Sequence, residues 1–235
     1  MTSPKVGADG YSRRIQFYSE DVPQLLLETL GASDWVSYLD LGCGDGSLLY
    51  ALNEQGYFKG KSVYAIDSSE ARINLVRNIN KELTCLVGDA CKTQLDDGSI
   101  DLLVTTQVIE HVADDGKMVR EMRRILSPGG RVYLSTVFKK RYAWYFYRCN
   151  NKWTLDPTHL REYTQEDQLL EILKANEFEI IANQKTLDGR PIADAILRRL
   201  RVPRNIYKHR SFKLLRALRV PIPGYYQWEL VCRKR

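Results

Sequence analysis

Short apolar segments that are rich in β-branched residues alternate with amphipathic segments along most of the chain. Apolar runs of roughly four to eight residues bounded by turn signals predict buried strands, and apolar positions at helical spacing predict the helices between them. This alternation predicts an α/β fold in which helices cover a mostly parallel sheet. The predicted strands are 36–42, 62–67, 83–90, 100–107 and 131–138, and the predicted helices are 47–55, 68–79 and 118–126.

The pattern then changes. Residues 139–163 are aromatic and basic without a clear period, which predicts a loop that covers one edge of the sheet. Thr164 begins a T-x-x-D sequence of the kind that caps a helix. Two further strands are predicted at 178–187 and 225–234, on either side of a basic insert at 188–223.

We expect residues 1–35 to form an N-terminal helical cap and residues 36–235 to form the main domain. The chain has 235 residues, of which 44% are hydrophobic, and this is enough to bury a substantial core. No apolar run approaches the roughly 18 residues of a membrane-spanning helix, and the first residues lack the apolar stretch of a signal peptide. These features predict a cytoplasmic protein. Five cysteines without a C-x-x-C pair indicate neither a disulfide framework nor a zinc site.

The formal charge of +6 is unevenly distributed. From Lys185 to Arg235 there are 14 basic and 3 acidic residues, a net +11, which leaves −5 for residues 1–184. Within this basic part, residues 190–220 place apolar and cationic side chains at helical spacing. Such a segment suits peripheral contact with an anionic membrane or with RNA phosphates, and a solvated face is the structural alternative.

Three glycines, Gly42, Gly44 and Gly46, lie between the first predicted strand and its helix. Backbone amides and a helix N-terminus meet there at the carboxyl edge of the sheet, where doubly wound folds bind nucleotide-like ligands. Ser47 stands where the dinucleotide pattern G-x-G-x-x-G/A requires its last small residue, so the match to NAD-binding enzymes is imperfect. Asp67 ends the second strand, where a carboxylate can hydrogen-bond both hydroxyls of a ribose.

Two additional acids change the interpretation of this turn. Asp40 ends the first strand and Asp45 lies inside the turn. Carboxylates at these positions would repel a pyrophosphate but would attract an ammonium or sulfonium group. The sequence therefore favours a positively charged ligand.

These motifs resemble those of the class I S-adenosylmethionine-dependent methyltransferases, especially methyltransferase type 11 proteins and the ubiquinone-pathway O-methyltransferases. The first family motif, (V/L)LDxGCGxG, corresponds to YLDLGCGDG, and the next two acids correspond to Asp67 in YAID and Asp89 in VGDA. Later motifs correspond to GSIDLLVTTQVIEHV and MVREMRRILSPGGRVYLSTV, so the resemblance extends over about residues 36–187. It implies a Rossmann-like fold with a seven-stranded, mostly parallel sheet, strand order 3-2-1-4-5-7-6, and an antiparallel last strand.

The resemblance also implies S-adenosylmethionine as the cofactor, released as S-adenosylhomocysteine. Residues near Asp40 would surround its methionine portion, Asp67 would bind the ribose, Asp89 would flank the adenine, and Gln107 would lie near the methionine or the transferred methyl. The implied cofactor-binding residues are Asp40, Gly42, Cys43, Gly44, Asp67, Ser68, Asp89, Ala90 and Gln107. In relatives the N-terminal segment closes over the cofactor, and the candidates for that role here are Tyr11, Arg13 and Arg14.

Ubiquinone-pathway members of the family, and members that methylate the 3′ end of small RNAs, form a divalent-metal site from an E-V-I-E-H sequence and a later histidine. Here Glu110, His111 and His159 match that pattern, whereas Gln107 replaces the first glutamate. An amide oxygen can ligate a hard cation, but the lost negative charge weakens the site. A metal at Gln107, Glu110, His111 and His159 is therefore an alternative that the sequence does not favour.

His159 is the candidate general base, because an imidazole can take a hydroxyl proton as the methyl group arrives. The structural alternative is that His159 orders its loop through Asp156 or Glu162, and for His111 packing after the fourth strand is the favoured interpretation. Aromatic residues after the fifth strand either line an acceptor pocket or cover the sheet edge. They are Trp144, Tyr145, Tyr147 and Trp153.

The sequence thus predicts methyl transfer from S-adenosylmethionine to a small-molecule or lipid-like acceptor, with a hydroxyl as the preferred methylated group. The alternatives are an RNA methyltransferase, an NAD-dependent Rossmann enzyme, and a cofactor-binding protein without catalysis.

Overall fold

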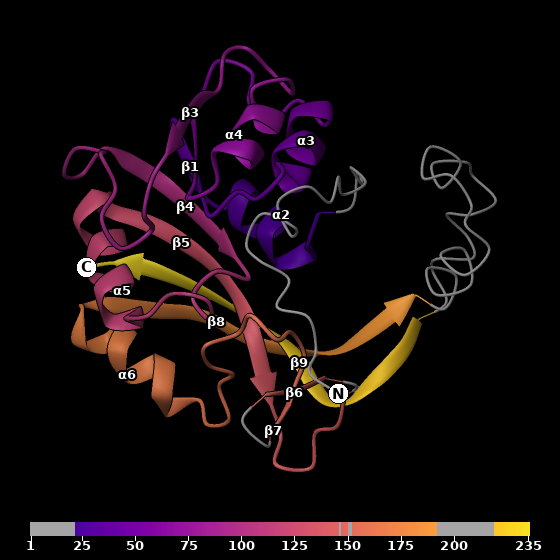
Figure 1. Ribbon diagram of the computed structural model, residues 1–235. Helices are drawn as coiled ribbons and strands as arrows, with labels where there is room; N and C mark the ends of the chain where they lie inside the picture. Colours follow the sequence, from indigo (N-terminus) through magenta and orange to yellow (C-terminus); the bar gives the residue numbers. More distant parts are fainter. Residues whose placement is uncertain (1–21, 146, 150–151, 192–218) are drawn as a thin grey trace, which may run out of the picture.

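A computed structural model describes residues 22–145, 147–149, 152–191 and 219–235. Its centre is a seven-stranded sheet with the order β3-β2-β1-β4-β5-β9-β8 (Figure 1). The strands are β1 (Ser37–Leu41), β2 (Ser62–Asp67), β3 (Thr84–Val87), β4 (Ile100–Thr106), β5 (Leu126–Lys139), β8 (Phe178–Pro191) and β9 (Arg219–Lys234). The helices are α2 (Gln24–Gly31), α3 (Ser47–Glu54), α4 (Glu70–Val76), α5 (Asp115–Ile125) and α6 (Asp167–Ala175).

The sheet is parallel from β3 to β5, and β9 runs antiparallel to both of its neighbours, β5 and β8. Counted along the chain, this is the order 3-2-1-4-5-7-6 with an antiparallel last strand. The expected Rossmann-like α/β fold is therefore confirmed. Because β1 lies between β2 and β4, the segments that follow these three strands meet at one edge of the sheet.

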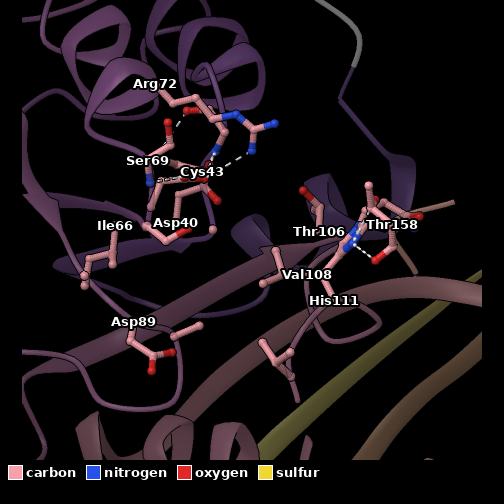
Figure 2. A pocket seen from close by; sticks show the side chains of 18 of the residues that line it. Asp40, Cys43, Ile66, Ser69, Arg72, Asp89, Thr106, Val108, His111 and Thr158 are labelled. Atoms are coloured by element: carbon pink, nitrogen blue, oxygen red, sulfur yellow. Dashed lines mark hydrogen bonds and ion pairs between the residues drawn. The ribbon is translucent and has the colours of Figure 1, made fainter. Parts of the chain in front are cut away.

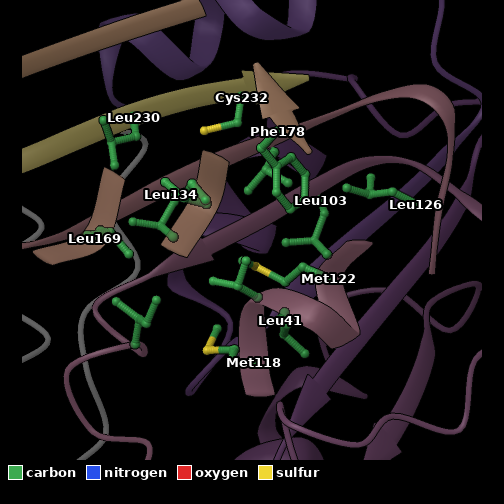
Figure 3. Packing of buried hydrophobic residues seen from close by; sticks show 14 of the residues in the cluster. Leu41, Leu103, Met118, Met122, Leu126, Leu134, Leu169, Phe178, Leu230 and Cys232 are labelled. Atoms are coloured by element: carbon green, nitrogen blue, oxygen red, sulfur yellow. The ribbon is translucent and has the colours of Figure 1, made fainter. Parts of the chain in front are cut away.

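Helices cover both faces of the sheet (Figure 1). On one face, α2, α3 and α4 bury a cluster that includes Leu26, Leu49 and Ile73. On the other face, α5 and α6 bury Met118, Met122, Leu169 and Leu173 against β4, β5 and β9 (Figure 3). The strands are thus buried on both sides, as their continuous apolar runs predict.

Two helix starts differ from the sequence prediction. Helix α5 begins at Asp115, before the predicted residue 118, because the Asp114 side chain accepts a hydrogen bond from the Lys117 amide at 2.8 Å and caps the helix. The predicted cap at Thr164 is wrong, since α6 begins only at Asp167. The Gln168 side-chain oxygen instead accepts hydrogen bonds from the amides of Thr164 and Gln165.

Other boundaries shift for local reasons. The second predicted helix, 68–79, is shorter in the structure, where α4 spans Glu70–Val76. Helix α5 ends at Ile125, just before the S-P-G-G sequence at 127–130, which belongs to β5. The register between β4 and β5 shifts there, between Ile100 and Leu102, and Gly129 adopts a φ of 75°. Glycine accommodates this backbone conformation at little steric cost.

The last two strands form a long antiparallel arm. Pairing continues to Pro191 and Arg219, beyond the predicted ends at 187 and 225. The predicted loop at 139–163 contains a two-stranded hairpin, β6 (Tyr147–Cys149) and β7 (Lys152–Thr154).

Residues 1–21 of the expected cap and 192–218 of the basic insert lie outside the described residues. Among the helices that the structure describes, none is long and apolar enough to cross a membrane.

Trp228 on β9 joins the sheet to the α6 side of the core. Its side chain is fully buried, its ring packs edge-to-face on Phe138 and Tyr163, and its indole N–H donates to Asn183 Oδ1 at 2.7 Å. We predict that Trp228→Ala lowers the free energy of unfolding by about 3–5 kcal/mol, because it leaves a large cavity. Denaturant unfolding measures this change. Trp144→Ala is the control, since Trp144 is 44% exposed and should cost less than about 1 kcal/mol; equal losses would contradict the prediction.

Candidate active site

The glycine turn after β1 is built by close backbone approach. The amides of Gly42 and Cys43 both donate to the Ile66 carbonyl oxygen, at 2.7 and 2.9 Å, which ties the turn to the end of β2. Gly42 has a φ of 80°, and a Cβ atom there would lie 2.3 Å from Val108 Cγ2. Only glycine satisfies both the backbone conformation and this contact. The turn therefore reaches the carboxyl end of β4 as well as that of β2.

A cavity of about 1340 Å³ lies at this edge of the sheet (Figure 2). In Figure 2, Asp89 and the pair formed by His111 and Thr158 lie on opposite sides of the view. All nine residues expected to bind the cofactor line the cavity, and so does His159. The sequence interpretation did not include several other lining residues, among them Arg72, Asp114, Lys117, Leu155 and Thr158.

Asp40 is a buried acid, and one of its carboxylate oxygens has no hydrogen-bond partner among the described residues. Its side chain is 1% exposed, and among the described residues its Oδ1 has no hydrogen-bond partner. Burial, together with the nearby charge of Asp67, raises the pKa of Asp40 to about 7. A cationic ligand beside Asp40 would satisfy the buried oxygen and stabilise its ionised form.

Asp67 has both carboxylate oxygens fixed by backbone amides. Oδ2 accepts from Gly44 N and Oδ1 from Ser69 N, each at 2.9 Å. Arg72 on α4 lies 3.7 Å from Oδ2. This arrangement holds the Asp67 carboxylate in one orientation at the cavity wall, between the glycine turn and the start of α4.

Gln107 follows β4 in an unusual backbone conformation, with a φ of 55°. Its amide donates to the Ser135 carbonyl oxygen at 2.9 Å, which holds the residue against β5. A non-glycine residue in this region of φ is uncommon and is often found at functional sites. The conformation places Gln107 at the cavity and turns Val108 toward Gly42.

Glu110, His111 and His159 form a cluster in which one ligand atom from each residue lies within 4.8 Å of the others. The rings of His111 and His159 are 4.8 Å apart and meet edge-to-face. Glu110 is fully buried, and its Oε2 accepts from Thr136 Oγ1 at 2.9 Å, while its Oε1 has no partner among the described residues. Three of the four alternative metal ligands are therefore brought together. Burial and the neighbouring His159 lower the pKa of His111.

His159 is nearly buried, with a side chain 5% exposed, and its Nδ1 lies 3.0 Å from Glu162 Oε1. Of the two partners expected from sequence, Glu162 therefore contacts the ring. Burial opposes ionisation of Glu162, but hydrogen bonds from His159, the Leu155 amide and Thr154, with the charge of Lys139, lower its pKa overall. An ionised Glu162 carboxylate accepts hydrogen bonds but has no hydrogen to donate.

The aromatic residues after β5 lie apart from the cavity lining where the structure describes them. Trp144 packs edge-to-face on Trp153 at 5.8 Å, and Tyr145 packs on Tyr225 at 6.2 Å. None of these side chains lines the cavity, whereas Leu155 from the same region does. The side chain of Tyr147, and all of Tyr11, Arg13 and Arg14, lie outside the described residues.

The model of the family described as "Methyltransferase domain" matches residues 39–134. This match covers less than half of the chain, and it shows that residues 39–134 are similar to a methyltransferase domain. It is 35% identical over 107 residues to the ubiquinone biosynthesis O-methyltransferase of Caulobacter vibrioides, a match covering 43% of this chain and 41% of that protein. The chain spans about a third to a half of the length of the first curated relatives it matches.

Solved structures share the fold of this chain at low sequence identity. A putative methyltransferase from Bacillus halodurans matches with a TM-score of 0.62 and 17% identity, covering 88% of this chain and 98% of that one. The [4+2]-cyclase SpnF matches with a TM-score of 0.60 and 18% identity, covering 89% and 80%. These similarities establish the architecture, and the chemistry must be argued from the site itself.

Gly42→Ala should disturb the glycine turn after β1. The new methyl group would overlap Val108 and the backbone would be strained, so we predict a loss of about 1–3 kcal/mol in the free energy of unfolding. Thermal or denaturant unfolding measures it. Gly31→Ala is the matched control, because no atom lies within 4 Å of a Cβ at that position. If the two variants unfolded alike, the close-approach explanation would be wrong.

Proposed function

We propose that this methyltransferase transfers a methyl group from S-adenosylmethionine to a hydroxyl group of a small-molecule or lipid-like acceptor. One observation carries the proposal: His159 lines the same cavity as Asp40 and Asp67. An imidazole and acids that suit a cationic ligand thus line one cavity. This combination suits deprotonation of a hydroxyl at the moment of transfer.

In this proposal, different cavity residues bind different parts of the cofactor. Asp40, with its unpartnered buried oxygen, would accept a hydrogen bond from the ammonium group of the methionine portion. Asp67 would take the ribose hydroxyls, and Asp89 with Ala90 would flank the adenine. Gly42 leaves the backbone open to close approach. Gln107 would lie beside the methionine portion at the end of β4.

The bound cofactor supplies an electrophilic methyl group on a positively charged sulfur. The acceptor oxygen forms a bond to the methyl carbon, the carbon–sulfur bond breaks, and its electron pair stays on sulfur as neutral S-adenosylhomocysteine. The hydroxyl proton passes to His159 Nε2. The protein's part is alignment of the two reactants, exclusion of water and acceptance of that proton.

A metal-assisted reaction is the main alternative at the same residues. Glu110, His111 and His159 supply one carboxylate and two imidazoles, and the unpartnered oxygen of buried Glu110 favours a cation there. Gln107 contributes no charge. A site with this donor set would lower the proton affinity of a coordinated hydroxyl, so His159 would then act as a ligand rather than as a base.

Contact with an anionic surface remains a prediction for residues 190–220, most of which lie outside the described residues. The described neighbourhood supports it. Tyr142 and Trp144 are 69% and 44% exposed, next to exposed Lys140 and Arg141, and the Trp144 amide donates to Pro223 at the base of the β8–β9 arm. Aromatic and basic side chains together suit a membrane interface, which would present a lipid-like acceptor. The charge alone would also suit RNA.

Cofactor affinity should depend on the ionisation of Asp40. With a pKa of about 7, Asp40 loses its charge as pH falls, so S-adenosylhomocysteine affinity should drop about tenfold from pH 8 to pH 6. Isothermal titration measures it, with NAD as the competing ligand. The stability of the free protein should change in the opposite direction. Because the pKa of Asp40 is higher in the folded than in the unfolded state, this group stabilises the fold as pH falls through about 7. Asp40→Asn should bind weakly at every pH, and tight NAD binding without S-adenosylhomocysteine binding would refute the proposal.

Methyl transfer itself can be tested with labelled cofactor in a cell extract. Wild-type protein should label a product of low molecular weight or a lipid, and His159→Ala should reduce the rate by about 10²–10⁴. The same assay in excess chelator separates the two mechanisms: full activity excludes the metal, and lost activity that Mg²⁺ restores supports it. Label found only in RNA would favour the RNA alternative. Cofactor binding without methyl transfer to any acceptor would support the alternative of a cofactor-binding protein without catalysis.

A further inference from the structure

Glu162 is the point on which four separate segments converge. Its side chain is 7% exposed and lies between β7, the loop that carries His159, β5 and β9. Its Oε1 accepts from the Leu155 amide at 2.7 Å and from Thr154 Oγ1 at 2.8 Å, and it faces His159 Nδ1 at 3.0 Å. Its Oε2 lies 3.2 Å from Lys139 Nζ and 3.4 Å from the Tyr225 hydroxyl.

Every one of these neighbours can donate a hydrogen to the carboxylate. A peptide amide can only donate, and an ammonium group can only donate. The amide of Leu155 and the charge of Lys139 therefore keep Glu162 ionised and hold its two oxygens in place. An ionised carboxylate is only an acceptor, so the hydrogen in the contact with His159 must be on Nδ1.

When the ring is neutral, the other ring nitrogen then has no hydrogen. A neutral imidazole carries one N–H, and when it is on Nδ1, Nε2 presents a lone pair. The surroundings of the ring agree with this tautomer. Glu110 is the nearby buried carboxylate, and its Oε1 has no hydrogen-bond donor among the described residues, so His159 Nε2 does not donate to it.

We infer that Glu162 is a positioning residue that fixes His159 as the Nδ1–H tautomer and so directs the Nε2 lone pair into the cofactor cavity. The catalytic meaning of this inference rests on the proposed function. A lone pair held in this way can receive the proton of an acceptor hydroxyl, or it can ligate a cation if the metal alternative holds. In both cases Glu162 determines which nitrogen faces the acceptor, without touching the acceptor itself.

Nitrogen-15 spectroscopy of the histidine rings tests the tautomer without knowledge of the acceptor. The chain has three histidines, so three ring systems are observed, and His159→Gln identifies the signals of His159. At pH 9, where an ordinary imidazole is neutral, wild-type His159 should show a protonated Nδ1 and an unprotonated Nε2. A predominantly protonated Nε2 in the wild type would overturn the inference.

Two variants test the role of Glu162. Glu162→Gln keeps the side-chain size but replaces a charged acceptor by a neutral one, so the tautomer ratio should shift about fivefold toward Nε2–H. Glu162→Ala should shift it further. Glu166→Gln is the matched control, because Glu166 lies four residues further along the chain but pairs with Lys185 and Asn183, and it should leave the ratio unchanged.

An unchanged ratio in Glu162→Gln would also overturn the inference, and this variant decides the matter if Glu162→Ala does not fold. S-adenosylhomocysteine titration of the same samples separates the two proposals. Loss of cofactor binding in the wild type with the expected tautomer would defeat the proposed function alone. Normal cofactor binding with the wrong tautomer would defeat only the role of Glu162.

Discussion

Two backbone amides, those of Gly42 and Cys43, share one acceptor, the carbonyl oxygen of Ile66, and the site depends on that contact. It determines where the chain leaves β1 and brings the turn across the end of β2. Asp67, the next residue after Ile66, then receives the Gly44 amide on its side chain. The same turn meets Val108 beyond β4. Three parallel strands are thereby joined at their carboxyl ends by contacts that need glycine.

The part of the cavity that contains Asp40, Asp67 and Asp89 could be predicted from sequence because its signals are local. A strand, a glycine turn and an acid at the end of the next strand lie within about thirty residues, and the physical reasons for each are general. All nine expected cofactor residues line one cavity. The strand order was implied by the family resemblance, and the structure confirms it.

The other half could not be predicted in the same way, because its contacts join distant positions. Glu162 meets residues that lie from Lys139 to Tyr225 in the sequence, and no short pattern marks that convergence. The hairpin β6–β7 and the length of the β8–β9 arm likewise depend on pairing partners that composition does not reveal. Thr164 was predicted to cap a helix, but its backbone amide donates to the Gln168 side-chain oxygen instead. Which side chain bonds the backbone at a helix start depends on local geometry that the sequence pattern does not specify. Asp40 was predicted as a cofactor residue, but its titration near neutral pH follows from a burial that only the fold produces.

The outer edge of β5 is the boundary between the parallel part of the sheet and the antiparallel pair β9 and β8, and we call this boundary the seam. Strands β1 to β5 and their helices form a parallel unit that contains Asp40, Asp67 and Asp89, and β9 joins that unit only along its outer edge. The family match covers residues 39–134 and ends inside β5, next to this seam. The part of the chain beyond β5, which carries the His159 loop and the β8–β9 arm, is therefore attached to the parallel unit along one edge of the sheet. A substitution beyond β5 that keeps the pairing with β9 would leave the backbone contacts between the ends of β1 and β2 unchanged.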